Sequence, residues 1–148
     1  MSEKEAKARL KINKLLEESN WRLLDQDDKK ANVIVENNTK KGDNLSASNG
    51  FIDYLLLDQQ NKPLIVLEAK SEDKDPLVGK EQAREYAKGQ GVSFVILSNG
   101  VQHYFWNIDS GNPQLITKFP SQDSISYQNK YTPIKTNLLK ENITPDYI

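Results

Sequence analysis

Three charged residues stand in two apolar runs of this chain, where a lone charge is unfavourable. Asp53 leads into the run 54–57, and Glu68 and Lys70 close the run that begins at Leu64. A carboxylate or ammonium group that leaves water without a partner loses on the order of several kcal/mol. Because side chains alternate between the two faces of a strand, Glu68 and Lys70 point the same way. These charges therefore need an explanation.

A shared metal ion supplies one. If the run that holds Asp53 lies beside the run that holds Glu68, their carboxylates can meet and offer the hard oxygen ligands that Mg²⁺ prefers. Lys70 would then lie beside the ion, where it could orient or deprotonate an attacking water and offset charge during phosphodiester hydrolysis. The alternative is structural: Glu68 and Lys70 form an ion pair at a strand end, and Asp53 begins a turn. The spacing alone is compatible with both.

Composition limits the other kinds of chemistry. The chain has 148 residues, of which 36% are apolar and 28% charged, as expected for one domain with a single core. It has no cysteine and one histidine, which leaves only oxygen-ligated metals as plausible ions. Its net charge of -1 is unlike that of an autonomous, tight nucleic-acid binder. No membrane span or signal peptide is evident in the sequence, so a cytoplasmic location is expected.

The first helix expected from the periodicity covers residues 3–19. Its packed stripe consists of Ala8, Ile12, Leu15 and Leu16. Glu5 falls in this stripe and Arg9 lies at its edge. The i, i+4 spacing of Glu5 and Arg9 allows an ordinary helix pair, but it also allows an acid that is aimed at the sheet.

A second helix is expected to begin at Pro76, with Asp75 as its N-cap, and to end at Gly89. One face of this helix carries Val78, Gln82 and Tyr86. Gln82 and Tyr86 thus present an amide and a phenol towards whatever Val78 packs near.

The remaining apolar runs predict strands at 33–36, 54–57, 64–70, 91–98, 101–106 and 115–117. The second helix forms a crossover between two of these runs, which should make those two strands parallel. Asn99 and Gly100 are expected to form a two-residue hairpin turn. We interpret His103 as a structural histidine, and Phe105 and Trp106 as packing residues. The polar stretch 37–49 is predicted to be a loop, in which Lys40 and Lys41 either touch phosphate or are solvated.

Taken in order, these residues resemble a known family. The motifs are Glu5-Ala6-x-x-Arg9, Gly50-Phe51-Ile52-Asp53-Tyr54, Glu68-Ala69-Lys70, Gln82-x-x-x-Tyr86 and Ser98-Asn99-Gly100. Their order resembles the PD-(D/E)xK nuclease superfamily, and more closely the N-terminal nuclease domain of type I restriction enzyme R subunits. The resemblance runs from about Glu5 to Phe119. Ala8 stands where that family commonly has Thr, and Ile52 rather than Pro precedes the strand acid; neither departure removes a ligand.

The resemblance implies an α/β fold of the restriction-endonuclease type, in which a mixed β-sheet is flanked by α-helices. The nuclease domain would span residues 1–120, and 121–148 would be a polar tail or a linker towards a translocase domain that this chain lacks. By resemblance, the catalytic residues are Asp53, Glu68 and Lys70, the metal ligands are Asp53 and Glu68 with help from Glu5, and the DNA-contacting residues are Gln82 and Tyr86.

The implied function is Mg²⁺-dependent endonuclease action on double-stranded DNA within a type I restriction-modification complex. The modification and specificity subunits would supply sequence recognition. ATP would be used only by translocase domains, since this chain has no Gly-x-x-x-x-Gly-Lys-Ser/Thr loop. The rival hypotheses are a non-catalytic DNA- or subunit-docking module of the same fold, and a resolvase or repair nuclease of the same superfamily. The chain is expected to be either a fragment or a stand-alone relative.

Overall fold

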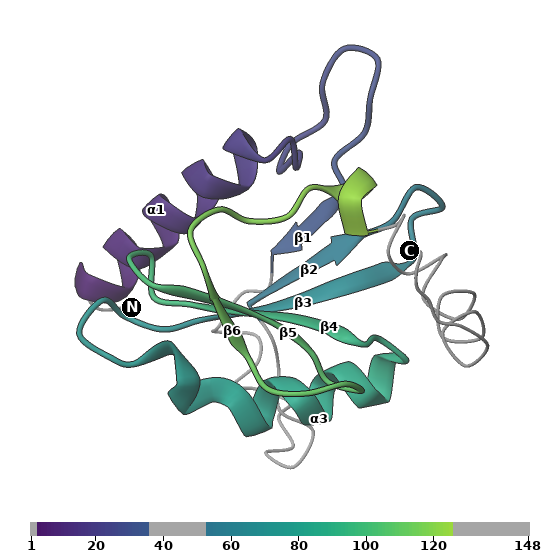
Figure 1. The fold of residues 1–148 in the computed structure, drawn as a ribbon. Helices are drawn as coiled ribbons and strands as arrows, with labels where there is room; N and C mark the ends of the chain where they lie inside the picture. The colour runs from purple at the N-terminus through teal and green to yellow at the C-terminus, as the bar shows by residue number, and fades with distance from the viewer. Residues whose placement is uncertain (1–2, 36–52, 126–148) are drawn as a thin grey trace, which may run out of the picture.

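The computed structural model describes residues 3–35 and 53–125. Its elements, shown in Figure 1, are α1 (Glu3–Glu18), β1 (Val33–Val35), β2 (Tyr54–Leu57), β3 (Pro63–Ala69), η2 (Pro76–Gly79), α3 (Lys80–Gln90), β4 (Phe94–Ser98), β5 (His103–Asn107) and β6 (Gln114–Ile116). The predicted loop at 37–49, with Lys40 and Lys41, lies outside the described residues, as does most of the predicted tail.

The six strands form one mixed sheet in the order β1-β2-β3-β4-β5-β6. β3 and β4 are parallel, with Ile65 opposite Phe94, and the other neighbouring pairs are antiparallel. The parallel pair is joined through η2 and α3, as expected for a crossover connection. Figure 1 shows α1 and α3 on opposite sides of this sheet. The expected α/β architecture, a mixed sheet flanked by helices, is confirmed.

Strand alternation divides the core into two layers. One layer packs against α1 and contains Ile12, Leu16, Trp21, Tyr54, Leu56, Ile65, Leu67 and Ile96. The other packs against α3 and contains Leu55, Val66, Ala83, Ala87, Val95, Leu97 and Trp106. Burying one large aliphatic side chain stabilises a fold by about 1.5–3 kcal/mol, so both helices are held chiefly by these contacts.

The packed face of α1 is shorter than the predicted stripe. Ala8, Ile12 and Leu16 are buried, whereas Glu5 is exposed, so the placement of this acid on the buried face was wrong. The reason is that close packing begins at Ala8. There the turn at Gly100 approaches so closely that a Cβ on Gly100 would lie 3.2 Å from the Ala8 Cα. Gly100 has a φ of +89°, a conformation that also favours glycine.

The second helix differs from its prediction at both ends. Asp75 does cap it, since the carboxylate accepts from the Leu77 amide at 2.9 Å, but Pro76–Gly79 is a 3-10 helix. A 3-10 turn has three residues and not 3.6, which rotates Val78 away from the predicted face and leaves it 67% exposed. The helix also continues past Gly89 and ends at Gln90, where Gly91 adopts a φ of +71°.

The β4–β5 turn lies one residue later than predicted. The Asn99 backbone N–H donates to the Gln102 carbonyl at 3.2 Å, so Gly100 and Val101 form the tip of the turn. The Asn99 side-chain oxygen accepts from the Val101 amide at 2.9 Å and from the Gln102 amide at 2.8 Å. Asn99 thus organises the turn from its base. It does not occupy the tip, which is where the prediction of an Asn99-Gly100 turn had placed it.

The packed region extends past the predicted boundary at residue 120. Ile125 is buried in the core layer that faces α1, and Gln122 donates to the Leu57 carbonyl at 2.8 Å. The Trp21 indole and the Ser19 hydroxyl each donate at 2.9 Å, to the Pro120 and Phe119 carbonyls respectively. Residues 119–125 therefore pack with the rest of the domain, because they supply an apolar side chain to its core and accept or donate hydrogen bonds to it.

Candidate functional site

One end of the sheet gathers the predicted catalytic residues. β3 ends at Ala69 and the parallel strand β4 ends at Ser98, while the antiparallel strand β2 begins at Tyr54. Tyr54 pairs with Leu67, so continuing this register by one residue places Asp53 opposite Glu68. Residues directly opposite each other on antiparallel strands lie about 5 Å apart at their Cβ atoms.

Asp53 is held from two directions. One carboxylate oxygen accepts from the Ala69 backbone amide at 2.8 Å, and the other accepts from the Arg9 guanidinium on α1. Asp53 is only 6% exposed. Its carboxylate therefore lies against the backbone link between Glu68 and Lys70, fixed by β3 and by α1 together.

Arg9 is a site residue whose partner the sequence did not reveal. The sequence placed it at the edge of a helix stripe, near Glu5. In the structure its side chain is 14% exposed and its guanidinium lies 5.2 Å from the centre of the Tyr54 ring, besides pairing with Asp53. An arginine so deeply buried requires a carboxylate, and the only sequence signal was the position of Arg9 at the edge of the packed stripe of α1.

Glu68 and Lys70 point the same way, as the alternation predicted. The Lys70 ammonium lies 3.1 Å from a Glu68 carboxylate oxygen, with side-chain exposures of 23% and 5% respectively. The ion pair proposed as the structural alternative is therefore present. It leaves the catalytic role open, because an ammonium that remains partly exposed can also reach a ligand.

Gly79 covers this pair from η2 and was also missed. A Cβ at Gly79 would lie 2.7 Å from the Glu68 Cγ and 2.9 Å from the Lys70 Cε. Only a hydrogen atom fits there, so the glycine lets η2 close directly over the two side chains. A glycine inside a helical pattern was the available signal.

Each buried acid of the site thus has a cation of its own. Asp53 pairs with Arg9, and Glu68 pairs with Lys70, so these four side chains sum to zero formal charge. Tyr54 beside them donates its hydroxyl to the Asn13 amide oxygen at 2.7 Å. Burial raises the pKa of Tyr54 to about 12, which keeps this phenol protonated near neutral pH.

The chemistry of the acids fits a hard divalent cation. Within residues 3–35 and 53–125, no three or more His, Cys, Asp or Glu side chains are grouped so that they could hold a metal ion. Mg²⁺ is often held by one or two carboxylates, with waters and phosphate completing its shell. Asp53 and Glu68 offer that set, whereas the exposed position of Glu5 gives no support for a third ligand. The metal roles stay predictions.

Gln82 and Tyr86 both lie half-buried on α3, beside the buried residues Ala83 and Ala87. Tyr86 packs against the core layer that faces α3. Their one-turn spacing is as predicted, and their contact with DNA stays a prediction.

The loop after Lys70 is tied to both of its neighbours. Lys11 and Lys4 on α1 form ion pairs with Glu72 and Asp73. The Asn99 side-chain amide donates to the Lys74 carbonyl at 2.8 Å. These contacts lock the segment between β3 and η2 against α1 and against the β4–β5 turn, which stabilises the end of the sheet that carries the acids.

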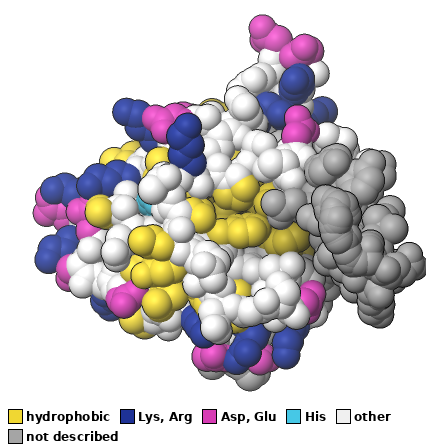
Figure 2. Space-filling model, viewed as in Figure 1, with side chains coloured by type: hydrophobic (Ala, Val, Ile, Leu, Met, Phe, Trp, Pro, Cys, Tyr) yellow, Lys and Arg dark blue, Asp and Glu magenta, His cyan; other side chains and the backbone are white. Residues whose placement is uncertain are grey.

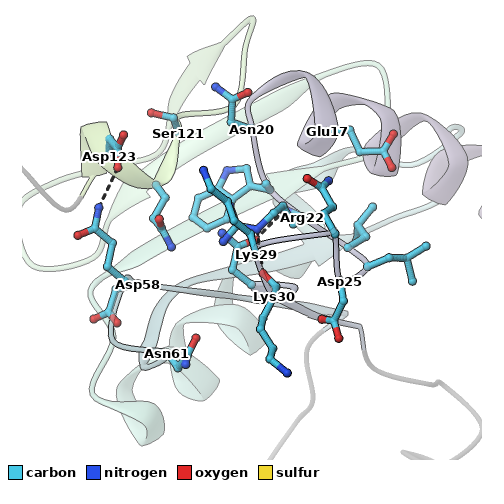
Figure 3. A pocket seen from close by; sticks show the side chains of 17 residues that line it. Glu17, Asn20, Arg22, Asp25, Lys29, Lys30, Asp58, Asn61, Ser121 and Asp123 are labelled. Atoms are coloured by element: carbon cyan, nitrogen blue, oxygen red, sulfur yellow. Dashed lines mark hydrogen bonds between the residues drawn. The ribbon is translucent and has the colours of Figure 1, made fainter.

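The structure also has an open cavity of about 1180 Å³ elsewhere (Figure 3). It is lined by most of the residues between Glu17 and Asn32, by the β2–β3 turn around Asp58 and Asn61, and by Ser121–Asp123. That turn lies at the opposite end of β2 from Asp53. None of the predicted catalytic, metal or DNA-contacting residues lines this cavity, so it is distinct from the acidic site.

Charges of both signs are mixed over the face of the molecule that Figure 2 shows. Figure 2 shows blue and magenta side chains interspersed around the rim of the face in view, without a large patch of either sign. This distribution agrees with the net charge of -1. Within the described residues, no helix is long and apolar enough to cross a membrane.

Comparison with known proteins places this geometry in context. Residues 23–120 match the family model described as type I restriction enzyme R protein N terminus (HSDR_N). A search of curated proteins finds no match. Among solved structures, one described as a fragment of an HsdR subunit of a type I restriction enzyme from Vibrio vulnificus YJ016 is similar, with a TM-score of 0.59 and 24% identity. The match covers 82% of this chain and 24% of that chain, and at this identity it shows the fold.

Proposed function

The chain belongs to the family of type I restriction enzyme R protein N termini, and from this premise we propose that it is a Mg²⁺-dependent nuclease domain that cuts double-stranded DNA. The observation that carries the proposal is that one end of the sheet holds the Glu68–Lys70 pair together with Asp53, whose carboxylate accepts from the Ala69 amide between them. Two buried carboxylates and a lysine at one strand end are the groups that metal-assisted phosphodiester hydrolysis needs.

In this proposal Asp53 and Glu68 hold the metal ion. Bound Mg²⁺ supplies Lewis-acid stabilisation of charge on phosphate and lowers the pKa of water. The Ala69 amide fixes one Asp53 oxygen at 2.8 Å, which orients the carboxylate before any ion arrives. Preorganised groups of this kind cost no reorganisation when the reaction occurs.

Lys70 acts on water or phosphate and not on the metal. Its ammonium is 3.1 Å from Glu68 and its side chain is 23% exposed, so it is not fully enclosed and can reach a ligand beside the carboxylate. There it can orient the attacking water and offset phosphate charge. Gln82 and Tyr86, each half-buried on α3, are proposed to contact or orient DNA.

The rest of the reaction is proposed to depend on other parts of a larger assembly. The chain spans 24% of the similar HsdR chain. We assign sequence recognition to modification and specificity subunits, and ATP-driven translocation to domains outside this chain. The net charge of -1 supports this division, since a domain without a strong excess of basic residues binds DNA weakly.

A second candidate is a non-catalytic docking module of the same fold. It is favoured by the finding that Asp53 and Glu68 already have the cations Arg9 and Lys70, so neither acid requires a metal ion for its burial. In this case the four charged side chains act as two structural ion pairs.

DNA cleavage by the full restriction complex, with this chain in its R subunit, tests the proposal. Complexes with Asp53→Asn are compared with the wild type on linear and branched duplexes in Mg²⁺. We expect loss of linear-duplex cleavage. Asp28→Asn serves as the control, because Asp28 is an exposed acid of the loop after α1, and it should leave cleavage unchanged. Unchanged cleavage by the Asp53→Asn complex would favour the docking module. Faster cleavage of branched than of linear duplexes by the wild-type complex would favour a resolvase or repair nuclease.

A further inference from the structure

We propose that Arg9 is a built-in counter-cation for Asp53 that competes with divalent metal for this carboxylate. The inference rests on the proposed metal site. It assigns to α1 a function that the sequence does not show: the helix supplies the positive charge that keeps the site neutral before metal binds.

The geometry places the Arg9 guanidinium directly against the Asp53 carboxylate. Its guanidinium donates to one Asp53 oxygen and lies 5.2 Å from the Tyr54 ring centre, while the two paired side chains are only 14% and 9% exposed. A guanidinium is always charged and cannot give up its proton to relieve repulsion. A divalent cation that approaches Asp53 therefore meets a fixed positive charge at the same oxygen.

The second Asp53 oxygen separates competition from positioning. It accepts from the Ala69 amide at 2.8 Å, a contact that does not involve α1. Asp53 therefore stays oriented when the guanidinium is removed. If Arg9 only positioned the carboxylate, its loss would weaken metal binding; if it competes, its loss will strengthen metal binding.

A purely structural role makes a third prediction. Arg9 also connects α1 to the sheet, so its removal will lower the melting temperature of the metal-free chain under any hypothesis. Only competition predicts that added metal raises the melting temperature more in the variant than in the wild type, because the stabilisation by a ligand grows with the logarithm of its affinity.

The experiment titrates Mn²⁺ and Mg²⁺ into the full chain by calorimetry and records melting with and without metal. For Arg9→Gln we expect about tenfold tighter, Asp53-dependent metal binding than in the wild type, since loss of one adjacent charge is worth at least this factor. Arg9→Lys should fall between the two, because an ammonium lacks the planar fork of arginine. It also keeps the test open if Arg9→Gln does not fold.

Arg84→Gln is the matched control. Arg84 also pairs with a carboxylate, that of Glu81, and lies 5.8 Å from the centre of the Trp106 ring, but on α3. Its substitution should leave metal affinity unchanged. Unchanged or weaker metal binding in both Arg9 variants would overturn the inference, as would metal binding that survives Asp53→Asn. Failure of the proposed function has a different result: the wild-type chain binds metal in the titration, but the complex that contains it does not cleave DNA.

Discussion

Gly79 lies so close to Glu68 that a Cβ on the glycine would come within 2.7 Å of the Glu68 Cγ. The contact is in the middle of the glutamate side chain, and the same Cβ would meet the Lys70 Cε at 2.9 Å. The 3-10 helix η2 and the Glu-x-Lys triplet therefore fit together only because residue 79 has no side chain. This relationship links the start of α3 to the proposed chemistry.

Gly79→Ala should displace Glu68 and Lys70. Overpacking of this kind costs about 1–3 kcal/mol of unfolding free energy, and we expect DNA cleavage to fall with it. Gly89→Ala is the control, since nothing lies within 4 Å of its added Cβ and it stands inside α3. That change should stabilise the chain by about 0.4–1 kcal/mol. Urea unfolding measures both, and equal stability of the two variants would contradict the close fit.

Lys70→Met tests whether the lysine does chemistry. The thioether preserves the packing against Gly79 but cannot orient water or offset phosphate charge, so cleavage should stop while calorimetric Mg²⁺ binding survives. Glu68→Ala should weaken both properties, because it removes a proposed ligand. A Lys70→Met enzyme that still cuts DNA would end the catalytic role and leave the ion pair as the function of Lys70.

Gln82→Ala should impair cleavage while the unfolding free energy stays within about 0.5 kcal/mol of the wild type, as for a surface position. For the phenol, Tyr86→Phe is the sharper change, because the Tyr86 ring packs on the core layer beside α3. Glu85→Ala, at an exposed position of the same helix, is the control for both variants. Circular dichroism and melting check the fold, and a loss of structure in Gln82→Ala would show that this face is core.

His103 should make the fold sensitive to mild acid. Burial lowers its pKa from the usual 6.5, and its ring nitrogen is 2.8 Å from the Ser98 hydroxyl. The unfolded chain then binds a proton more readily than the folded chain. The contribution of neutral His103 to the unfolding free energy is therefore present above pH 6.5 and is lost as the pH falls below it. Urea unfolding between pH 8 and pH 5, compared with His103→Asn, measures this. An equally steep decline in the variant would assign the effect to other groups.

The sheet and the acid-lysine arrangement could be predicted from local pattern. Strand alternation places Glu68 and Lys70 on one face, and a crossover through Pro76–Gln90 makes β3 and β4 parallel, as observed. Both inferences need only the period of a strand and the presence of a helical crossover, which the local sequence pattern reveals.

What the sequence missed depends on contacts between distant elements or on local changes of helix geometry. The pairing of Arg9 with Asp53 joins residues 44 positions apart, and no periodicity encodes it. The exposure of Val78 follows from a change of helix pitch at η2, which a wheel of fixed 100° steps cannot represent. The close approach of the Gly100 turn to Ala8 on α1 is likewise a tertiary contact that the sequence pattern did not show.

The most direct test of the account is DNA cleavage by full complexes that carry Asp53→Ala or Glu68→Ala, with ATP hydrolysis by the same complexes measured in parallel. Since both acids are proposed to hold the metal, cleavage should fall by more than about a hundredfold in each variant. ATP hydrolysis, assigned to domains outside this chain, should be unchanged. Cleavage near the wild-type rate in either variant would contradict the assignment of Asp53 and Glu68 as the metal-binding acids of a nuclease.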